Sequence, residues 1–200
     1  MFPAMRYLHL IPLAAVLAML LAAPASADLA RVVDALKVDG RVLLMRHAQT
    51  HSGIGDPSNF DLNDCSTQRN LDHRGREQSR RLGAALKAGG VTIAKALSSG
   101  WCRCRETARI ILDEMGETTK SIETFEPLNS FFEDRRPRDR RVREANAAIA
   151  AWSGKGVLLM STHMVNISGM TGRGVASGEV LVLQPTGDGY EIVASGTPGY

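Results

Sequence analysis

The sequence has few of the features that define non-globular proteins. Cysteine contributes only 3 of the 200 residues and aromatic residues only 5%, and no internal repeat or low-complexity segment is present. So few cysteines cannot build a disulfide-rich scaffold. The 24 basic and 21 acidic residues leave a formal charge of +3, which gives no general attraction to nucleic acid, and we expect no such partner. The composition, 44% hydrophobic and 22% charged, is typical of one globular domain with its own core.

Only the N-terminus carries a long hydrophobic run. Residues 1–21 are apolar apart from one arginine and one histidine. The central run, residues 10–21, is shorter than the roughly 20 residues that a membrane span needs. The small residues that end at Ala27 are typical of a signal-peptidase site. We therefore predict a signal peptide at residues 1–27, one domain at residues 28–200, and a periplasmic or secreted protein without stable membrane insertion; an uncleaved anchor is the alternative.

Export would place the three cysteines in an oxidising compartment, where one pair can form a disulfide bond. Cys102 and Cys104 are separated by one residue and would bridge poorly within a helix. Cys65 with Cys102, or Cys65 with Cys104, is the better pairing. Three unbridged thiols are the alternative.

Strands alternate with helices along the rest of the chain. Short apolar runs bounded by turn residues predict strands, and apolar side chains at helical spacing predict helices. Asp72 is expected to cap one helix, and Gly89-Gly90 and Gly116 are expected to end two. This order predicts a three-layer α/β sandwich, with a mostly parallel central sheet flanked by helices. The predicted strands are 41–46, 91–97, 121–125, 156–160, 179–184 and 190–194, the last two forming a hairpin, and the predicted helices are 73–88, 101–115, 140–152 and 165–170.

Arginine and histidine side chains follow three of the predicted strands. Arg46 and His47 end the first strand, Arg103 starts the helix after the second, and His163 follows the strand at 156–160. Sites in such sheets form beyond the carboxyl ends of the strands. We therefore expect these four side chains to meet at one edge of the sheet.

The segments around these residues, together with one loop, resemble the histidine phosphatase superfamily, whose fold is phosphoglycerate mutase-like. The family signature Arg-His-Gly has Ala48 in the glycine place here. The resemblance extends over nearly the whole chain after the signal peptide, in the family's order. The matching segments are Leu44-Met-Arg-His-Ala-Gln-Thr50, the loop and helix start Cys65 to Gln78, Ser98 to Ala108, and Ser161 to Gly172.

The resemblance implies a metal-independent phosphomonoesterase without a cofactor. His47 would attack phosphorus and form a phosphohistidine that water later hydrolyses. Arg46 and Arg103 would hold the phosphoryl oxygens through charge-assisted hydrogen bonds. His163 would donate to the same oxygens and stabilise the transition state.

Other polar residues have less certain roles in this interpretation. Gln68 and Arg69 would either bind substrate in the pocket or cap the loop. His51 and His73 are expected at the rim or facing solvent, because no histidine spacing here matches a zinc motif.

A general acid would protonate the leaving oxygen. Some branches of the family place an aspartate directly after the second histidine, where this chain has Met164. The segment at 126–135 offers three carboxylates. Of these, Glu133 and Asp134 are the preferred candidates, with little to separate them.

The substrate is expected to be a small phosphorylated molecule, such as a sugar phosphate or an envelope glycan. The run from Arg135 to Arg143 holds six arginines in nine positions. It would either attract a polyanion or form a solvated surface. A catalytically idle phospho-ligand-binding module is the alternative function, and a mutase conflicts with the predicted export.

Overall fold

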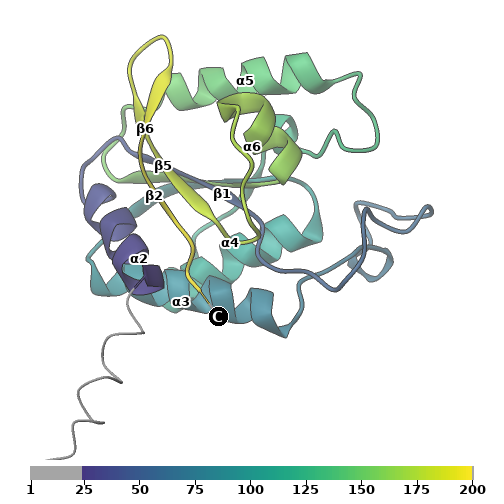
Figure 1. The fold of residues 1–200 in the computed structure, drawn as a ribbon, viewed down its shortest axis with the longest axis horizontal. Coiled ribbons are helices and arrows are strands. Elements are labelled where there is room, and N and C mark those ends of the chain that lie inside the picture. Colours follow the sequence, from purple (N-terminus) through teal and green to yellow (C-terminus); the bar gives the residue numbers. More distant parts are fainter. Residues whose placement is uncertain (1–23, 200) are drawn as a thin grey trace, which may run out of the picture.

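The computed structural model describes residues 24–199, and Figure 1 shows its layered arrangement. Most of the predicted signal peptide lies outside the described residues. The first described helix, α2 (Pro24–Ala35), spans the predicted cleavage point after Ala27. Sequence patterning did not predict this helix. Within residues 24–199, no helix has the length and apolar character needed to cross a membrane.

A six-stranded sheet forms the centre of the molecule, in the order β3-β2-β4-β1-β5-β6. Parallel pairing joins β1 to β4, β4 to β2 and β2 to β3, whereas β5 and β6 pair antiparallel at the other edge. This confirms the mostly parallel sheet and the C-terminal hairpin. The strands are β1 (Val42–Arg46), β2 (Ile93–Ser98), β3 (Glu123–Thr124), β4 (Val157–Thr162), β5 (Val180–Pro185) and β6 (Tyr190–Gly196).

Helices cover both faces of the sheet. Figure 1 shows α5 and α6 on one side, and α2, α3 and α4 on the other. The predicted three-layer sandwich is therefore confirmed. The remaining helices are α3 (His73–Ala88), α4 (Cys102–Met115), α5 (Arg138–Ala150) and α6 (Met164–Thr171), with short 3-10 turns at η1 (Cys65–Thr67) and η2 (Glu126–Leu128).

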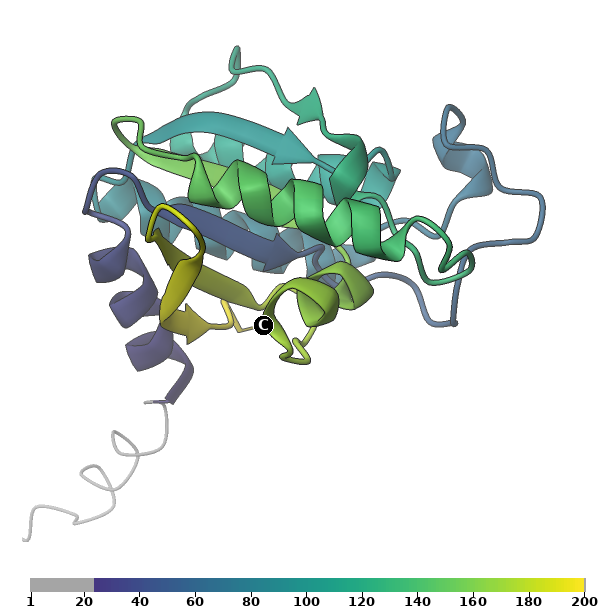
Figure 2. The ribbon, with the colours of Figure 1, turned by 90° about the horizontal axis from the view of Figure 1, so that it is seen from above.

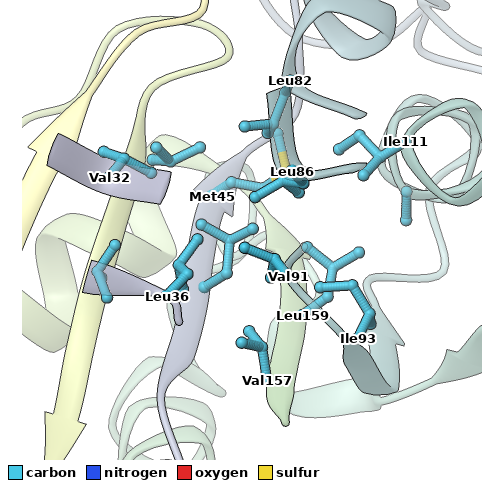
Figure 3. Packing of buried hydrophobic residues seen from close by; sticks show 14 of the residues in the cluster. Val32, Leu36, Met45, Leu82, Leu86, Val91, Ile93, Ile111, Val157 and Leu159 are labelled. Carbon is cyan, nitrogen blue, oxygen red and sulfur yellow. The ribbon is translucent and has the colours of Figure 1, made fainter. Parts of the chain in front are cut away.

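The sheet buries a separate hydrophobic cluster on each face. In β1, Leu43 and Met45 pack toward α2 and α3, whereas Val42 and Leu44 pack toward α5 and α6. Successive side chains of a strand point to opposite faces, so a strand buried on both sides must be apolar throughout. Figure 3 shows the first of these clusters around Met45.

The start of α3 and the ends of α3 and α4 can be compared with the capping residues predicted from the sequence. The side chain of Asp72 accepts a hydrogen bond of 2.8 Å from the backbone N–H of Gly75, which confirms the predicted cap of α3. Gly116 ends α4 in the left-handed conformation, with φ of 88°. Gly89 ends α3 with φ of −77°, a conformation that any residue can adopt. Glycine is needed there for lack of space and not for its backbone conformation. A Cβ atom there would lie only 2.1 Å from a methyl group of Val33 in α2.

The end of β4 differs from its predicted boundary. This strand extends to Thr162, two residues beyond the predicted end, although its final residues are polar. Both are fully buried, and the hydroxyl of Thr162 donates to the carbonyl of Leu128 at 2.6 Å. A partner from a distant segment thus satisfies the hydroxyl, and the strand can continue into the interior.

The structure joins Cys65 to Cys102, with their Cα atoms 5.7 Å apart. This is one of the two pairings that the sequence left open. Cys104 lies two residues further along α4 and is a buried free thiol. Burial raises the pKa of this thiol to about 12, so it stays protonated near neutral pH.

Candidate active site

The four residues predicted from strand ends meet at one pocket. Arg46 is the last residue of β1 and His47 follows it, Arg103 lies in the first turn of α4, and His163 precedes α6. β1, β4 and β2 are neighbours in the sheet, so their carboxyl ends meet at the same edge. Figure 2 shows the arrowheads of β1 and β2 pointing toward the side from which the loop at 51–70 extends. The pocket there has a volume of about 420 Å³, and all four residues line it.

His47 is held in one orientation by backbone groups. The ring nitrogen Nδ1 lies 2.9 Å from the carbonyl oxygen of Ala48, and the backbone N–H of His47 donates to the carbonyl of Thr162 at 2.8 Å. A carbonyl accepts only from a protonated nitrogen, so Nδ1 carries the hydrogen and Nε2 keeps its lone pair. Burial, and then the positive charge of Arg103, lower the pKa of His47 to about 3. The imidazole is therefore neutral, with Nε2 free to act as a nucleophile.

His163 lies beside His47, with the ring centroids 5.4 Å apart. Its Nε2 is 2.9 Å from the hydroxyl of Ser99, and the ring of Trp101 meets it edge-on at 5.2 Å. Burial lowers the pKa of His163 well below its usual value, and the neighbouring His47 and Arg103 lower it further. Ser99 thus orients a neutral second imidazole against the first.

Arg103 is held by a carboxylate that sequence analysis did not identify. Asp56 in the loop after β1 accepts hydrogen bonds from both terminal nitrogens of Arg103, at 2.8 and 3.0 Å. Both side chains are only 5% exposed. Asp56 also accepts from the indole N–H of Trp101 at 3.0 Å and from the backbone N–H of Arg69 at 2.9 Å. The two hydrogen bonds to Asp56 occupy the terminal nitrogens of Arg103, which would otherwise be available to bind phosphoryl oxygens.

The charge of Asp56 is set by these contacts. Burial alone would raise the pKa of its carboxyl group, but the hydrogen bonds from Arg103 and from the backbone of Arg69 lower it overall. Asp56 is therefore ionised at neutral pH. Sequence reasoning missed it because an aspartate before a proline in a glycine-containing loop is typical of a turn.

Two further arginines bring positive charge to the pocket. Nη1 of Arg46 donates to the carbonyl of Val175 at 3.0 Å. Nη1 of Arg69 donates to the hydroxyl of Thr50 and to the carbonyl of Gly53. Burial lowers the pKa of Arg46, as do the charges of Arg69 and Arg103. Arg46, Arg69 and Arg103 against Asp56 give three positive charges and one negative charge near His47, a balance that suits a phosphate dianion.

Gln68 and Arg69, the two loop residues with two possible roles, have different positions relative to the pocket. Arg69 lines the pocket, but Gln68 is not among the lining residues. The side chain of Gln68 accepts from the backbone N–H of Cys102 at 2.9 Å and donates to the carbonyl of Asp61 at 2.8 Å. Gln68 therefore ties the loop to the start of α4.

Both candidate acids, Glu133 and Asp134, line the pocket. Asp134 is paired with Arg136. Hydrogen bonds from Arg136 lower the pKa of Asp134 to about 2, so this carboxyl group holds no proton to donate near neutral pH. The third carboxylate of the segment, Glu126, does not line the pocket and is bonded to Arg140 and Arg141.

The arginine run is largely neutralised by neighbouring carboxylates. Arg136 pairs with Asp134, Arg138 with Asp139, and both Arg140 and Arg141 with Glu126. Charges paired in this way attract a polyanion less than the sequence alone indicates. Of the run, Arg141 lines the pocket.

The two peripheral histidines are exposed, as expected. Neither His51 nor His73 lines the pocket. Among residues 24–199, no cluster of three or more histidine, cysteine or carboxylate side chains is arranged to hold a metal ion.

Comparison with known proteins identifies the family. The family model of the histidine phosphatase superfamily (branch 1) matches residues 42–155. The chain belongs to this superfamily. It is 39% identical over 95 residues to a 2,3-bisphosphoglycerate-dependent phosphoglycerate mutase of Parvibaculum lavamentivorans. That match covers 44% of this chain and 40% of the relative, so the chain spans less than half the length of this curated relative.

Solved structures of related proteins share the fold at low sequence identity. A phosphoglycerate mutase from Bacillus anthracis superposes with a TM-score of 0.59 and 17% identity, covering 77% of this chain and 91% of its own. The protein histidine phosphatase SixA, complexed with tungstate, gives 0.59 and 19% identity, with 79% and 97% covered. The alpha-ribazole phosphatase from Shigella flexneri gives 0.58 and 15% identity, with 80% and 97% covered. At these identities the structural comparisons establish the phosphoglycerate mutase-like fold. Together with the family match, they support a phosphatase in general terms.

Proposed function

We propose that the protein is an exported phosphomonoesterase that hydrolyses a small phosphate ester through a phosphohistidine on His47. The observation that carries this proposal is the state of His47, a buried neutral imidazole whose Nδ1 is committed to the carbonyl of Ala48. A surface or structural histidine would not need its second nitrogen kept free beside buried arginines. The site therefore has the features of a nucleophile and not only of a binding pocket.

The first step transfers the phosphoryl group to the enzyme. The Nε2 lone pair of His47 forms a bond to phosphorus while the ester P–O bond breaks. Arg46, Arg69 and His163 line the pocket. The two arginines would balance the charge of the phosphoryl oxygens, and the neutral imidazole of His163 would donate a hydrogen bond to them. Arg103 joins them where the phosphoryl group replaces the carboxylate of Asp56. In the second step, water attacks phosphorus, the N–P bond breaks, and inorganic phosphate leaves.

The leaving oxygen requires a proton unless the alcohol is acidic. Glu133 is the better of the two candidates, since the carboxylate of Asp134 is occupied by an ion pair with Arg136. In this scheme Glu133 donates its proton to the leaving alkoxide. The resulting carboxylate then takes a proton from the attacking water.

Export is supported by the N-terminal sequence and is consistent with the disulfide bond between Cys65 and Cys102. We propose a periplasmic or secreted location on these grounds. The expectation of a sugar phosphate or an envelope glycan as substrate remains a prediction. Intact-mass measurement of the exported protein tests the cleavage after Ala27.

The decisive experiment is hydrolysis of an aryl phosphate in the presence of EDTA, comparing the wild type with His47→Ala and His51→Ala. We expect EDTA-resistant turnover that His47→Ala abolishes and His51→Ala leaves unchanged, because His51 is exposed and does not line the pocket. Acid-quenched protein should carry a labelled phosphoryl group only where His47 is present. Phosphate binding without turnover or labelling would instead show an idle binding module.

A further inference from the structure

Exposed apolar side chains gather at the mouth of the active-site pocket. Large hydrophobic residues are exposed at five positions of the described chain, and three of these line this pocket. Ile54 is 90% exposed, Phe132 47% and Met164 40%. They come from the loop after β1, the loop after η2 and the start of α6. The other two, Val38 and Val193, do not line the pocket.

Aromatic rings continue this apolar surface inward. The ring centroid of Trp101 lies 5.2 Å from that of His163, and the ring centroid of Phe60 lies 5.8 Å from that of Trp101. Both aromatic residues line the pocket. An apolar group attached to a phosphate on His47 would therefore meet hydrophobic side chains along the way to solvent. Such convergent apolar residues around a few charged groups are typical of a small-molecule site.

The polar groups at the mouth are mostly committed to partners within the protein. Arg141 donates to Glu126 and to the carbonyl of Ser130. Asp134 is bonded to Arg136. The hydroxyl of Ser130 accepts from the backbone N–H of Phe132 at 3.2 Å. A sugar needs several convergent donors and acceptors for its hydroxyl groups, whereas Arg141 and Asp134 already bond within the protein.

We propose that the pocket selects phosphate monoesters whose alcohol part is apolar, an alkyl chain or an aryl ring. This inference rests on the proposed phosphatase activity. The phosphoryl group occupies the end that His47 and the arginines form. The apolar part covers Ile54, Phe132 and Met164, and removes their side chains from water on binding.

The experiment measures kcat/KM for ethyl, butyl, hexyl and octyl phosphate below their micelle-forming concentrations. All four release primary alcohols of similar acidity, so differences between them report binding of the chain and not the chemical step. A fully buried methylene contributes about fourfold and a half-buried one about twofold, so we expect kcat/KM to rise roughly 60-fold from ethyl to octyl phosphate. Glycerol phosphate, similar in size to butyl phosphate, should be the poorer substrate of that pair.

The variant Phe132→Ser tests whether the rim causes this dependence. Its octyl-to-ethyl ratio should fall several-fold, and a ratio taken within one variant is independent of any change in overall activity. Val193→Ser removes an exposed apolar side chain that does not line the pocket, so this control should keep the wild-type ratio. Thermal melting of each variant verifies that it is folded.

The outcomes separate this inference from the proposed function. Hydrolysis of ethyl phosphate with a flat chain-length dependence, or a preference for glycerol phosphate, would overturn the apolar substrate class and keep the phosphatase. A wild-type chain-length dependence in Phe132→Ser would also overturn it. Absence of turnover on every ester, with no phosphoenzyme, would overturn the proposed function itself.

Discussion

The ion pair between Asp56 and Arg103 makes a specific prediction about phosphate affinity. Both carboxylate oxygens of Asp56 bond to the two terminal nitrogens of Arg103, and both side chains are 5% exposed. A phosphoryl group must either displace this carboxylate or bind without hydrogen bonds from the two terminal nitrogens of Arg103. In Asp56→Asn the side chain keeps nearly the same shape but loses its charge, so it competes less well for the guanidinium. We therefore expect Asp56→Asn to bind inorganic phosphate more tightly than the wild type.

The expected change in the phosphate Kd follows from the hydrogen bonds by which residue 56 competes with phosphate for Arg103. Charge-assisted hydrogen bonds contribute about 1.5–3 kcal/mol each, against about 1 kcal/mol for neutral ones. The amide oxygen of asparagine can keep at most one bond to the charged guanidinium, so the competitor is weakened by about one charge-assisted bond, roughly 2 kcal/mol. Partial retention by the amide reduces the effect, and we expect a roughly tenfold decrease in the phosphate Kd, about 1.4 kcal/mol.

Stability should change in the opposite direction. Removing one partner of a buried ion pair leaves the other charge uncompensated, which costs about 3–5 kcal/mol. The free Asp56→Asn protein should therefore melt at a lower temperature than the wild type. Saturating phosphate should restore a larger part of that loss than it adds to the wild type, because it supplies the missing negative charge beside Arg103.

Isothermal titration with inorganic phosphate and thermal melting with and without phosphate measure these two effects. Asp61→Asn is the matched control, since Asp61 is an exposed residue of the same loop and its side chain accepts hydrogen bonds from Asn63 and not from Arg103. Weaker phosphate binding in Asp56→Asn than in Asp61→Asn would refute the competition. It would show instead that Asp56 orients Arg103 toward the phosphoryl group.

Three further predictions concern His47, Glu133 and the disulfide bond. Burial lowers the pKa of His47 to about 3, below its unfolded value of about 6.5, so the unfolded chain binds more protons between these pH values. The free energy of unfolding should fall by up to about 1.4 kcal/mol per pH unit for this group as the pH drops below about 6.5, and urea denaturation of the wild type should show a steeper acid loss than a His47→Gln variant. Glu133→Gln should lower kcat for alkyl phosphates about a hundredfold while changing p-nitrophenyl phosphate little, because only the alkoxide needs a donated proton; equal losses on both substrates would exclude Glu133 as the acid. Replacing Cys65 and Cys102 together by serine should destabilise the fold by about 4 kcal/mol in the chain-entropy estimate for a 37-residue separation, measured by the denaturation midpoint; an unchanged midpoint under non-reducing conditions would contradict a bridge in solution.

Local signals in the sequence were sufficient for the main elements and for the four residues at the strand ends. Asp72 caps α3 by accepting a hydrogen bond from Gly75, which is only three residues away in the sequence. The apolar run of β1 predicts a strand buried on both faces, and Arg46 and His47 follow it directly. Because parallel strands end at a common edge, side chains placed by chain position alone come together in space. The order of the strands and helices was therefore enough to predict where the pocket lies.

Tertiary structure alone decided the contacts of the loop at 51–70. Asp56 meets Arg103 across 47 residues of chain, and Cys65 bonds to Cys102 rather than to Cys104. Neither choice follows from periodicity, since a loop without a repeating hydrophobic pattern takes its path from distant partners. The same holds for Phe132, whose exposure at the pocket mouth depends on three segments converging there. The sequence by itself determined the mostly parallel sheet and the meeting of Arg46, His47, Arg103 and His163 at its edge, because these follow from local pattern and strand direction. Tertiary packing decided which charge faces Arg103 and which side chains surround the leaving group, because these contacts join segments that carry no local signal for one another.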